Sequence, residues 1–315
     1  MSVEAACARH DPRHYTPPDL PPDLRRMAGR VVPLDVGAPG KVGLLELEMA
    51  PVAGKTRITR RYQQAPLYIF SPLYIDPARP DMAFVYLLHQ GGGIVQGDRY
   101  RFDLVCKPGV AAHVTTQAAT KLYRMERDFA TQWTEIAVGA DAVLEYLPDP
   151  VIPFRDARFH QRTRLVIDPT ATAIVGETLL PGRVAYGERH AYTLFTSRTD
   201  AVAPDGSLLF ADRIAFDPTR RPLQTPGRLG PYDVFATLFV AAPRPAPAEL
   251  VARLRAALAP HADVLAGASE LPNQCGAAVR ILGPSSLPVK RAFDAAWRAA
   301  RLATLGVPPP DRRKG

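Results

Sequence analysis

The chain has 315 residues, of which 47% are hydrophobic and 22% are charged, so it is long enough to bury a sizeable core and too apolar to be disordered. The 39 Lys and Arg against 31 Asp and Glu give a net charge of +8, but the basic residues are spread singly among acids, which argues against nucleic-acid binding. A positive surface equally suits an acidic protein partner. The 33 prolines argue against a helical bundle, because an interior proline removes a helical hydrogen bond.

Cysteine usage and hydropathy indicate the compartment. No stretch reaches the roughly 18 apolar residues of a membrane-spanning helix, and residues 1–27 mix charge with proline where a signal peptide would be apolar. Cys7, Cys106 and Cys275 lack Cys-x-x-Cys spacing, and no two histidines have metal-chelating spacing. The sequence therefore predicts a cytoplasmic protein without a membrane segment, disulfides or a stable metal site.

The ends of the chain differ from its middle. Residues 1–42 have little hydrophobic periodicity and four prolines between positions 17 and 22, so we expect a flexible, proline-rich arm that lies outside the core and can become ordered on a partner. From Gly43 onward, apolar residues alternate with Glu46 and Glu48 in the period of two typical of a half-buried strand. We expect one domain over residues 43–304 and a flexible tail over residues 305–315.

The middle of the chain repeats a strand–turn–strand pattern three times. The turns fall at Gly109, Gly139 and Thr170, which are 30 and 31 residues apart. A fixed period in this range is a signature of stacked supersecondary units. We therefore expect a mainly β fold in which hairpins are layered into an elongated body, with one more hairpin turn at Asp205-Gly206.

Two helices are expected near the end of the chain, over residues 247–258 and 288–302. Both segments carry apolar residues at helical spacing, and the first begins with a proline at a first-turn position. The second helix places Phe293 and Trp297 on one apolar face. This face either packs in the core or forms a partner-binding surface, and both alternatives remain open.

The glycine-rich loop over residues 91–98 does not match a nucleotide-binding loop. Asp98 stands where a phosphate-binding loop has lysine, and Gln96 stands where a dinucleotide fold has its third glycine. A Gly-x-Ser-x-Gly nucleophile motif is also absent. Glu145 and Glu177 fall near the same phase of adjacent repeats, so stacking could bring both carboxylates to one face, as a glycoside hydrolase requires. The alternative is that each is a solvated or salt-bridged strand residue.

Four segments are more specific than these generic patterns, and in order and spacing they resemble the urease accessory protein UreD family, also known as UreH. The resemblance extends from about Gly43 to Leu302. The segments are Gly91-Gly-Gly-Ile-Val-Gln-Gly-Asp98, Thr115-Thr-Gln-Ala-Ala-Thr-Lys-Leu-Tyr-Arg124, Leu144-Glu-Tyr-Leu-Pro-Asp-Pro-Val-Ile-Pro-Phe-Arg155 and Gly176-Glu-Thr-Leu-Leu-Pro-Gly-Arg183.

The resemblance implies a non-enzymatic maturation factor. Such a protein would form a complex with UreF and UreG, bind apo-urease, and support GTP-dependent delivery of nickel to the urease active site. The GTPase would be the partner, in agreement with the missing phosphate-binding loop. The implied fold is mainly β, with strands stacked in a helix-like manner and two helices near the C-terminus. No cofactor would be bound stably, and nickel would be present only in transit.

The resemblance also implies a polar passage for nickel. The residues that match the family's motifs are Asp98, Thr120, Lys121 and Glu177. Carboxylate and hydroxyl oxygens bind a divalent ion weakly and exchange it fast, which suits transit. For Asp98 the alternative is a role in stabilising the turn that it ends.

Two other functions remain as alternatives at this stage: an elongated β-solenoid glycoside hydrolase that uses Glu145 and Glu177, and a basic protein-binding module. The C-terminal end also departs from the family. Its usual tryptophan-containing tail is replaced here by Val307-Pro-Pro-Pro310 and a basic end, which leaves the contacts of the tail open.

Overall fold

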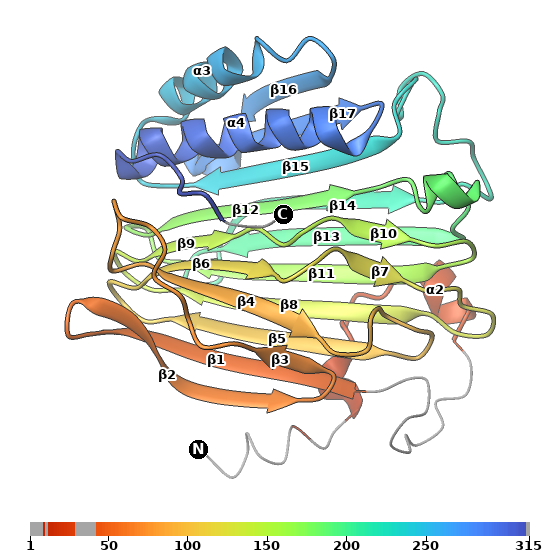
Figure 1. The fold of residues 1–315 in the computed structure, drawn as a ribbon, viewed down its shortest axis with the longest axis horizontal. Coiled ribbons are helices and arrows are strands. Elements are labelled where there is room, and N and C mark those ends of the chain that lie inside the picture. The colour runs from red at the N-terminus through yellow and green to blue at the C-terminus, as the bar shows by residue number, and fades with distance from the viewer. Residues whose placement is uncertain (1–8, 10–11, 29–41, 313–315) are drawn as a thin grey trace.

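Two β-sheets lie face to face and make up most of the molecule (Figure 1). The computed structural model describes residue 9 and residues 12–28 and 42–312. Sheet A has seven strands in the order β14-β13-β11-β8-β5-β1-β2. Their bounds are β1 Val42–Val52, β2 Lys55–Gln64, β5 Arg99–Cys106, β8 Ala130–Val138, β11 Arg158–Ile167, β13 Leu194–Val202 and β14 Leu208–Phe216.

Sheet B has ten strands, of which eight follow the order β16-β17-β15-β12-β9-β6-β4-β3, while the short strands β7 and β10 pair beside them. Their bounds are β3 Leu67–Ile69, β4 Ala83–His89, β6 Ala111–Thr116, β7 Thr120–Leu122, β9 Val143–Tyr146, β10 Val151–Pro153, β12 Thr172–Leu179, β15 Val234–Ala241, β16 Leu265–Glu270 and β17 Gly276–Gly283.

From β4 to β13 the chain alternates between the two sheets, and the strands at the centre of each sheet are parallel to their neighbours. This is a solenoid-like stack, so the predicted mainly β, helix-like arrangement of strands is confirmed. The hairpin turn at Asp205-Gly206 is also confirmed, because β13 and β14 are antiparallel and Gly206 has a φ of 86°.

The three repeat units themselves are not hairpins, and this part of the prediction is wrong. The turn at Gly109 joins β5 of sheet A to β6 of sheet B, and the turns at Gly139 and Thr170 join β8 to β9 and β11 to β12 in the same way. The reason is that each strand presents an apolar face to the other strand of its unit. The two strands therefore pack through side chains, and their backbones hydrogen-bond to the neighbouring repeats.

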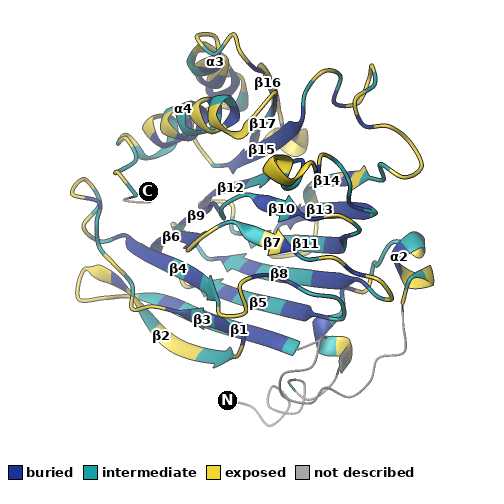
Figure 2. Ribbon diagram, turned by 45° about the vertical axis from the view of Figure 1, so that its right-hand side comes forward, coloured by how far each residue is buried: buried dark blue, intermediate teal, exposed yellow. Residues whose placement is uncertain are grey.

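The main core lies between the sheets, and a second core lies between sheet B and the C-terminal helices. The first contains Leu104 and Ile136 from sheet A and Val114 and Leu144 from sheet B. The second is formed by α3 (Pro247–Leu258) and α4 (Ser286–Leu305), whose buried sides face sheet B (Figure 2). Both predicted helices are confirmed, although α4 begins at Ser286 and ends at Leu305, three residues beyond the predicted end. The cap residue Gly306 follows with a left-handed φ of 72°.

Part of the N-terminal arm packs on the outer face of sheet A. Residues 12–28 include the short helices η1 (Pro12–Tyr15) and α2 (Pro22–Arg26). Tyr15 and Leu24 are buried, and Leu24 contacts Phe129 and Leu194. The expectation that the arm contributes nothing to the core is therefore wrong for these residues, because its apolar side chains cover an apolar strip of the sheet. The flexibility of the arm stays a prediction.

The C-terminal tail returns to the body of the protein. The Tyr86 hydroxyl of β4 donates a hydrogen bond to the carbonyl oxygen of Arg312 at 3.0 Å, and the Arg312 guanidinium lies 3.1 Å from Asp294 of α4. The same guanidinium lies over the ring of Trp297. These contacts place the described part of the tail beside α4. Two further 3-10 helices, η2 (Val184–Tyr186) and η3 (Pro272–Gln274), lie in loops.

Candidate functional site

The glycine-rich loop joins β4 to β5 and ends at Asp98, whose side chain is buried. Asp98 Oδ2 accepts hydrogen bonds from the Tyr100 hydroxyl at 2.6 Å and from the Val95 amide at 2.9 Å. His89 Nε2 lies 2.8 Å from the same hydroxyl and donates to it, because the hydroxyl proton is used toward Asp98. Burial, with the nearby Asp98 charge, raises the pKa of Tyr100, so this phenol stays protonated. Asp98 thus stabilises its turn and also belongs to a polar chain that runs from the buried Asp98 and Tyr100 to the half-buried His89.

A cavity of about 210 Å³ lies beside this polar chain. Its walls come from β3, β4, the glycine loop, β5, β8 and the segment that runs from the end of β6 into β7. Apolar side chains such as Leu67 and Phe102 form part of its lining. The polar residues of the lining are His89, Tyr100, Thr116, Gln117, Thr120, Lys121 and Gln132. The cavity is therefore lined by both polar and apolar side chains, and it lies at one end of the interior between the sheets.

Glu177 of β12 is held by two neutral donors from sheet A. Gln161 Nε2 donates to its Oε2 at 2.6 Å and Ser197 Oγ donates to the same atom at 2.7 Å. Burial raises the pKa of Glu177, and these two hydrogen bonds oppose the rise. Among the described residues no Lys, Arg or His forms an ion pair with Glu177, which is unusual in so arginine-rich a chain. Arg280, which forms an ion pair with Asp212, acts on Glu177 only from a greater distance, where it also lowers the pKa of Glu177. The structure therefore places a carboxyl group without a direct ion pair between the two sheets.

Strand register shows which predicted passage residues share this interior. Val151 of β10 pairs with Thr120 on one side and with Leu179 on the other. Leu122, Val151 and Leu179 all belong to the core between the sheets. Because side chains alternate along a strand, Thr120 and Glu177 face the same interior. Lys121 belongs to the cavity wall, but its side chain falls on the opposite face and is exposed. Asp98, Thr120 and Glu177 are thus gathered around the interior, and the Lys121 side chain is not.

Glu145 lies on the other face of sheet B, under α4. It pairs with Ile174 of β12. Glu177 lies three residues further along β12, so its side chain is on the opposite face of the sheet from that of Ile174. Glu145 is buried, with His113 Nδ1 at 2.7 Å and with the Trp297 Nε1 donor at 3.2 Å. The expectation that stacking brings Glu145 and Glu177 to one face is therefore wrong. The residue of β12 that pairs with Glu145 is separated from Glu177 by an odd number of residues, so the two carboxylates lie on opposite faces of sheet B. The paired acids of a glycoside hydrolase are not formed.

Phe293 and Trp297 of α4 point into the molecule. Trp297 is only 3% exposed, and Phe293 is half-buried against Gly176 of β12. A Cβ atom on Gly176 would lie 2.5 Å from Cζ of Phe293, so the helix rests directly on the strand backbone. Both side chains therefore pack in the core, which is the first of the two alternatives for this helix face. Trp297 does not belong to an exposed apolar surface. Partner binding through this helix stays a prediction.

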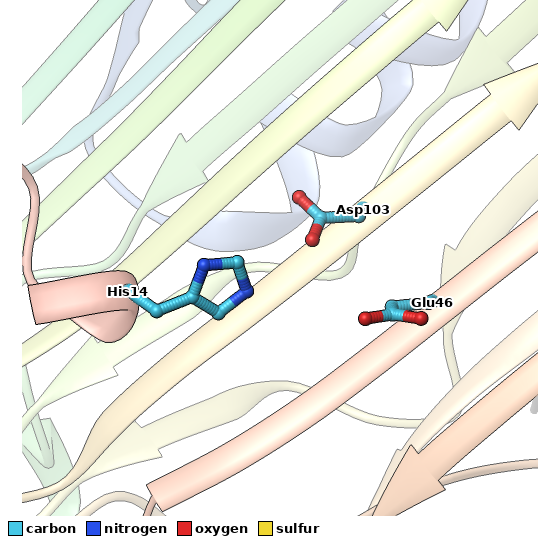
Figure 3. A group of neighbouring side chains, drawn as sticks. All are labelled: His14, Glu46 and Asp103. Carbon is cyan, nitrogen blue, oxygen red and sulfur yellow. The ribbon is translucent and has the colours of Figure 1, made fainter. Parts of the chain in front are cut away.

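A group of potential metal ligands lies on the outer face of sheet A. Ligand atoms of His14, Glu46 and Asp103 all lie within 4.8 Å of one another (Figure 3). Each carboxylate is already paired, however: Glu46 with Arg9, and Asp103 with Arg101 Nε at 2.9 Å from both of its oxygens. A divalent cation there would lie next to two guanidinium groups. The group therefore acts as an ion-pair network that fastens the arm to the sheet.

Sequence reasoning missed the residues that surround the predicted ones. Tyr100, Gln161 and Ser197 contact Asp98 or Glu177 directly, and His89 contacts Tyr100. Strand alternation could have suggested Tyr100, because it lies two residues after Asp98. Gln161 and Ser197 could not have been found in this way, since they reach Glu177 across the space between the sheets.

None of the described helices is long and apolar enough to cross a lipid bilayer.

The sequence model of the UreD urease accessory protein family matches residues 41–315. The chain is 44% identical to urease accessory protein UreD 2 of Streptomyces griseus over 283 residues, which covers 88% of this chain and 95% of that protein. It is 38% identical to urease accessory protein UreD of Haloarcula marismortui, covering 89% and 92% of the two chains. It is 36% identical to urease accessory protein UreD of Cenarchaeum symbiosum, covering 89% and 99%. The chain therefore belongs to the UreD urease accessory protein family.

Proposed function

We propose that this chain is a non-enzymatic, cytoplasmic scaffold that acts with UreF and UreG on apo-urease and supports the GTP-dependent delivery of nickel. The partners and the nickel cargo follow from the resemblance of its motifs to the family. The observation that carries the proposal is Glu177, a carboxyl group inside the solenoid without an ion-pair partner among the described residues. A route for a dication needs such groups, because oxygen ligands must replace the water that the ion loses.

The other polar residues of the interior fit the same role. Asp98, with Tyr100 and His89, lies at one end, and Thr120 borders the cavity there. Hydroxyl and carboxyl oxygens are weak, fast-exchanging ligands for Ni²⁺, whereas a site of several histidines would retain it. In the proposed role nickel is a cargo in transit between partners, and the chain holds no stable cofactor.

The basic protein-binding module is the remaining alternative, and it requires no interior route. The two functions differ in what happens to nickel when the chain is absent. If the chain is a nickel-delivery scaffold, urease that is produced without it folds and assembles but is not loaded with nickel.

The test is to express urease with UreF and UreG, with and without this chain, at ordinary nickel and bicarbonate. We expect purified urease of unchanged subunit composition that contains little nickel and has little activity when the chain is absent. Restoring the chain from a second plasmid should restore both. Full nickel content and activity without the chain would contradict the proposal.

A further inference from the structure

A groove of about 590 Å³ lies on the outer face of the protein, between the N-terminal arm and strands β13 and β14 of sheet A. Five arginines contribute to its lining, against three aspartates, and it lies away from the cavity between the sheets. The arginines are Arg198, Arg213, Arg220, Arg221 and Arg228.

The arm already shows how an acidic segment binds this face. Asp19 accepts from Arg198 and lies 3.2 Å from Arg162, while Asp23 accepts hydrogen bonds from Arg220 at 3.1 Å. Between them, Leu20 packs against the apolar cluster that contains Leu24. Acidic residues at both ends and apolar residues between them therefore match this surface.

The remaining arginines of the groove have no such partners. Within the described part of the chain, Arg213, Arg221 and Arg228 form no ion pair, and all three are exposed. Arg213 also lies directly opposite Arg198 in the β13–β14 ladder. Like charges in opposite positions of a sheet destabilise it unless an anion lies between or beside them. Asp19 and Asp200 compensate Arg198, but none of the described carboxylates does the same for Arg213.

We propose that this groove binds an acidic segment of a partner protein, with its carboxylates on Arg213, Arg221 and Arg228. The guanidinium fork matches a carboxylate in a bidentate manner. The volume of the groove and the exposed Pro22 in its wall suit a peptide with apolar side chains better than a single small anion. The net charge of +8 adds attraction at longer range. This inference does not depend on nickel, because it rests on the charges of Arg213, Arg221 and Arg228. Ser197 also lines the groove, and it donates to Glu177 of the proposed route.

The test measures binding of two fluorescently labelled peptides to the full chain by anisotropy. One peptide repeats Asp-Leu-Glu, and its neutral counterpart repeats Asn-Leu-Gln. We expect the acidic peptide to bind and the neutral one to bind at least about 10-fold more weakly. The triple variant Arg213→Gln/Arg221→Gln/Arg228→Gln should raise the Kd of the acidic peptide about 10-fold, since three exposed ion pairs together account for roughly that factor.

The matched control removes the same charge elsewhere. Arg57, Arg60 and Arg61 are exposed on β2, and replacing all three with Gln should change the Kd less than about 2-fold. Circular dichroism checks that both variants are folded, and Arg213→Glu alone provides a second test with a smaller change of sequence. Equal weakening by the two triple variants would overturn the proposal, because it would show attraction by net charge alone. Equal binding of both peptides, or tighter binding of a single-stranded oligonucleotide or of phosphate, would also overturn it.

Discussion

Arg301 of α4 is fully buried and forms ion pairs that connect the C-terminal helix to sheet B and to the loop before β4. Its Nη2 atom lies 2.6 Å from Asp76 Oδ2, and its Nε atom lies 3.3 Å from Glu145 Oε1. Replacing Arg301 with Met keeps most of the volume of the side chain but leaves two buried carboxylates without their cation. We therefore expect Arg301→Met to destabilise the protein strongly.

The structure limits how large this loss can be. Breaking a buried ion pair by removing one partner costs about 3–5 kcal/mol, because the remaining charge is buried and uncompensated. Glu145 keeps hydrogen bonds with His113 and Trp297, and Asp76 keeps one from the Ala78 amide at 2.9 Å. These remaining bonds keep the expected loss for Arg301→Met near the lower end of that range, at about 3 kcal/mol.

The assay is urea denaturation of the full chain followed by tryptophan fluorescence, with Arg298→Met as the matched control. Arg298 is exposed on the same helix, so its replacement should change the free energy of unfolding by less than about 0.5 kcal/mol. The double variant Arg301→Met/Asp76→Asn should recover part of the loss, because it removes one of the uncompensated charges. If Arg301→Met costs no more than Arg298→Met, the ion pairs do not hold α4 in place.

Two further predictions concern stability. Burial lowers the pKa of His160 to about 4, so between about pH 6.5 and 4 the unfolded chain binds a proton that the folded chain does not. The free energy of unfolding should therefore fall on acidification through this window, by up to about 1.4 kcal/mol per pH unit, and His160→Gln should remove that part of the slope; an unchanged slope would contradict the assignment. Gly176→Ala should cost about 1–3 kcal/mol, because the new methyl group would lie 2.5 Å from Phe293 Cζ. Thermal unfolding measures this cost, Gly267→Ala in open space is the control, and equal melting temperatures would refute the close packing.

The periodic parts of the fold could be predicted from the sequence, and the pairing of its strands could not. Alternating apolar residues and turns at a fixed spacing identify the stacked units, and helical spacing identifies α3 and α4. Whether the two strands of a unit pair with each other or face each other depends on contacts with the neighbouring units. Gly109 and Gly139 permit either a hairpin or a turn between sheets, so the local sequence is ambiguous.

The candidate site was predictable only where a motif carried it. Asp98, Thr120 and Glu177 were found through family motifs, and their shared interior became visible only from the strand register. Glu145 was misplaced because a small error in the phase between repeats reverses the face of a strand on which a residue lies. Arm residues such as Asp19 pair with arginines far along the chain, and no local pattern predicts such contacts.

Glu177→Gln tests the proposed interior route most directly. The amide oxygen can still accept hydrogen bonds from Gln161 and Ser197, so the variant should fold and assemble while it loses the negative charge. Urease co-expressed with this variant and its partners under limiting nickel is purified, and its nickel content and activity are compared with those obtained with the wild-type chain. Glu270→Gln, an exposed position on β16, is the matched control. We predict a several-fold lower nickel content with Glu177→Gln and no change with Glu270→Gln, at equal recovery of the complex. Wild-type nickel loading by an assembled Glu177→Gln complex would contradict the route.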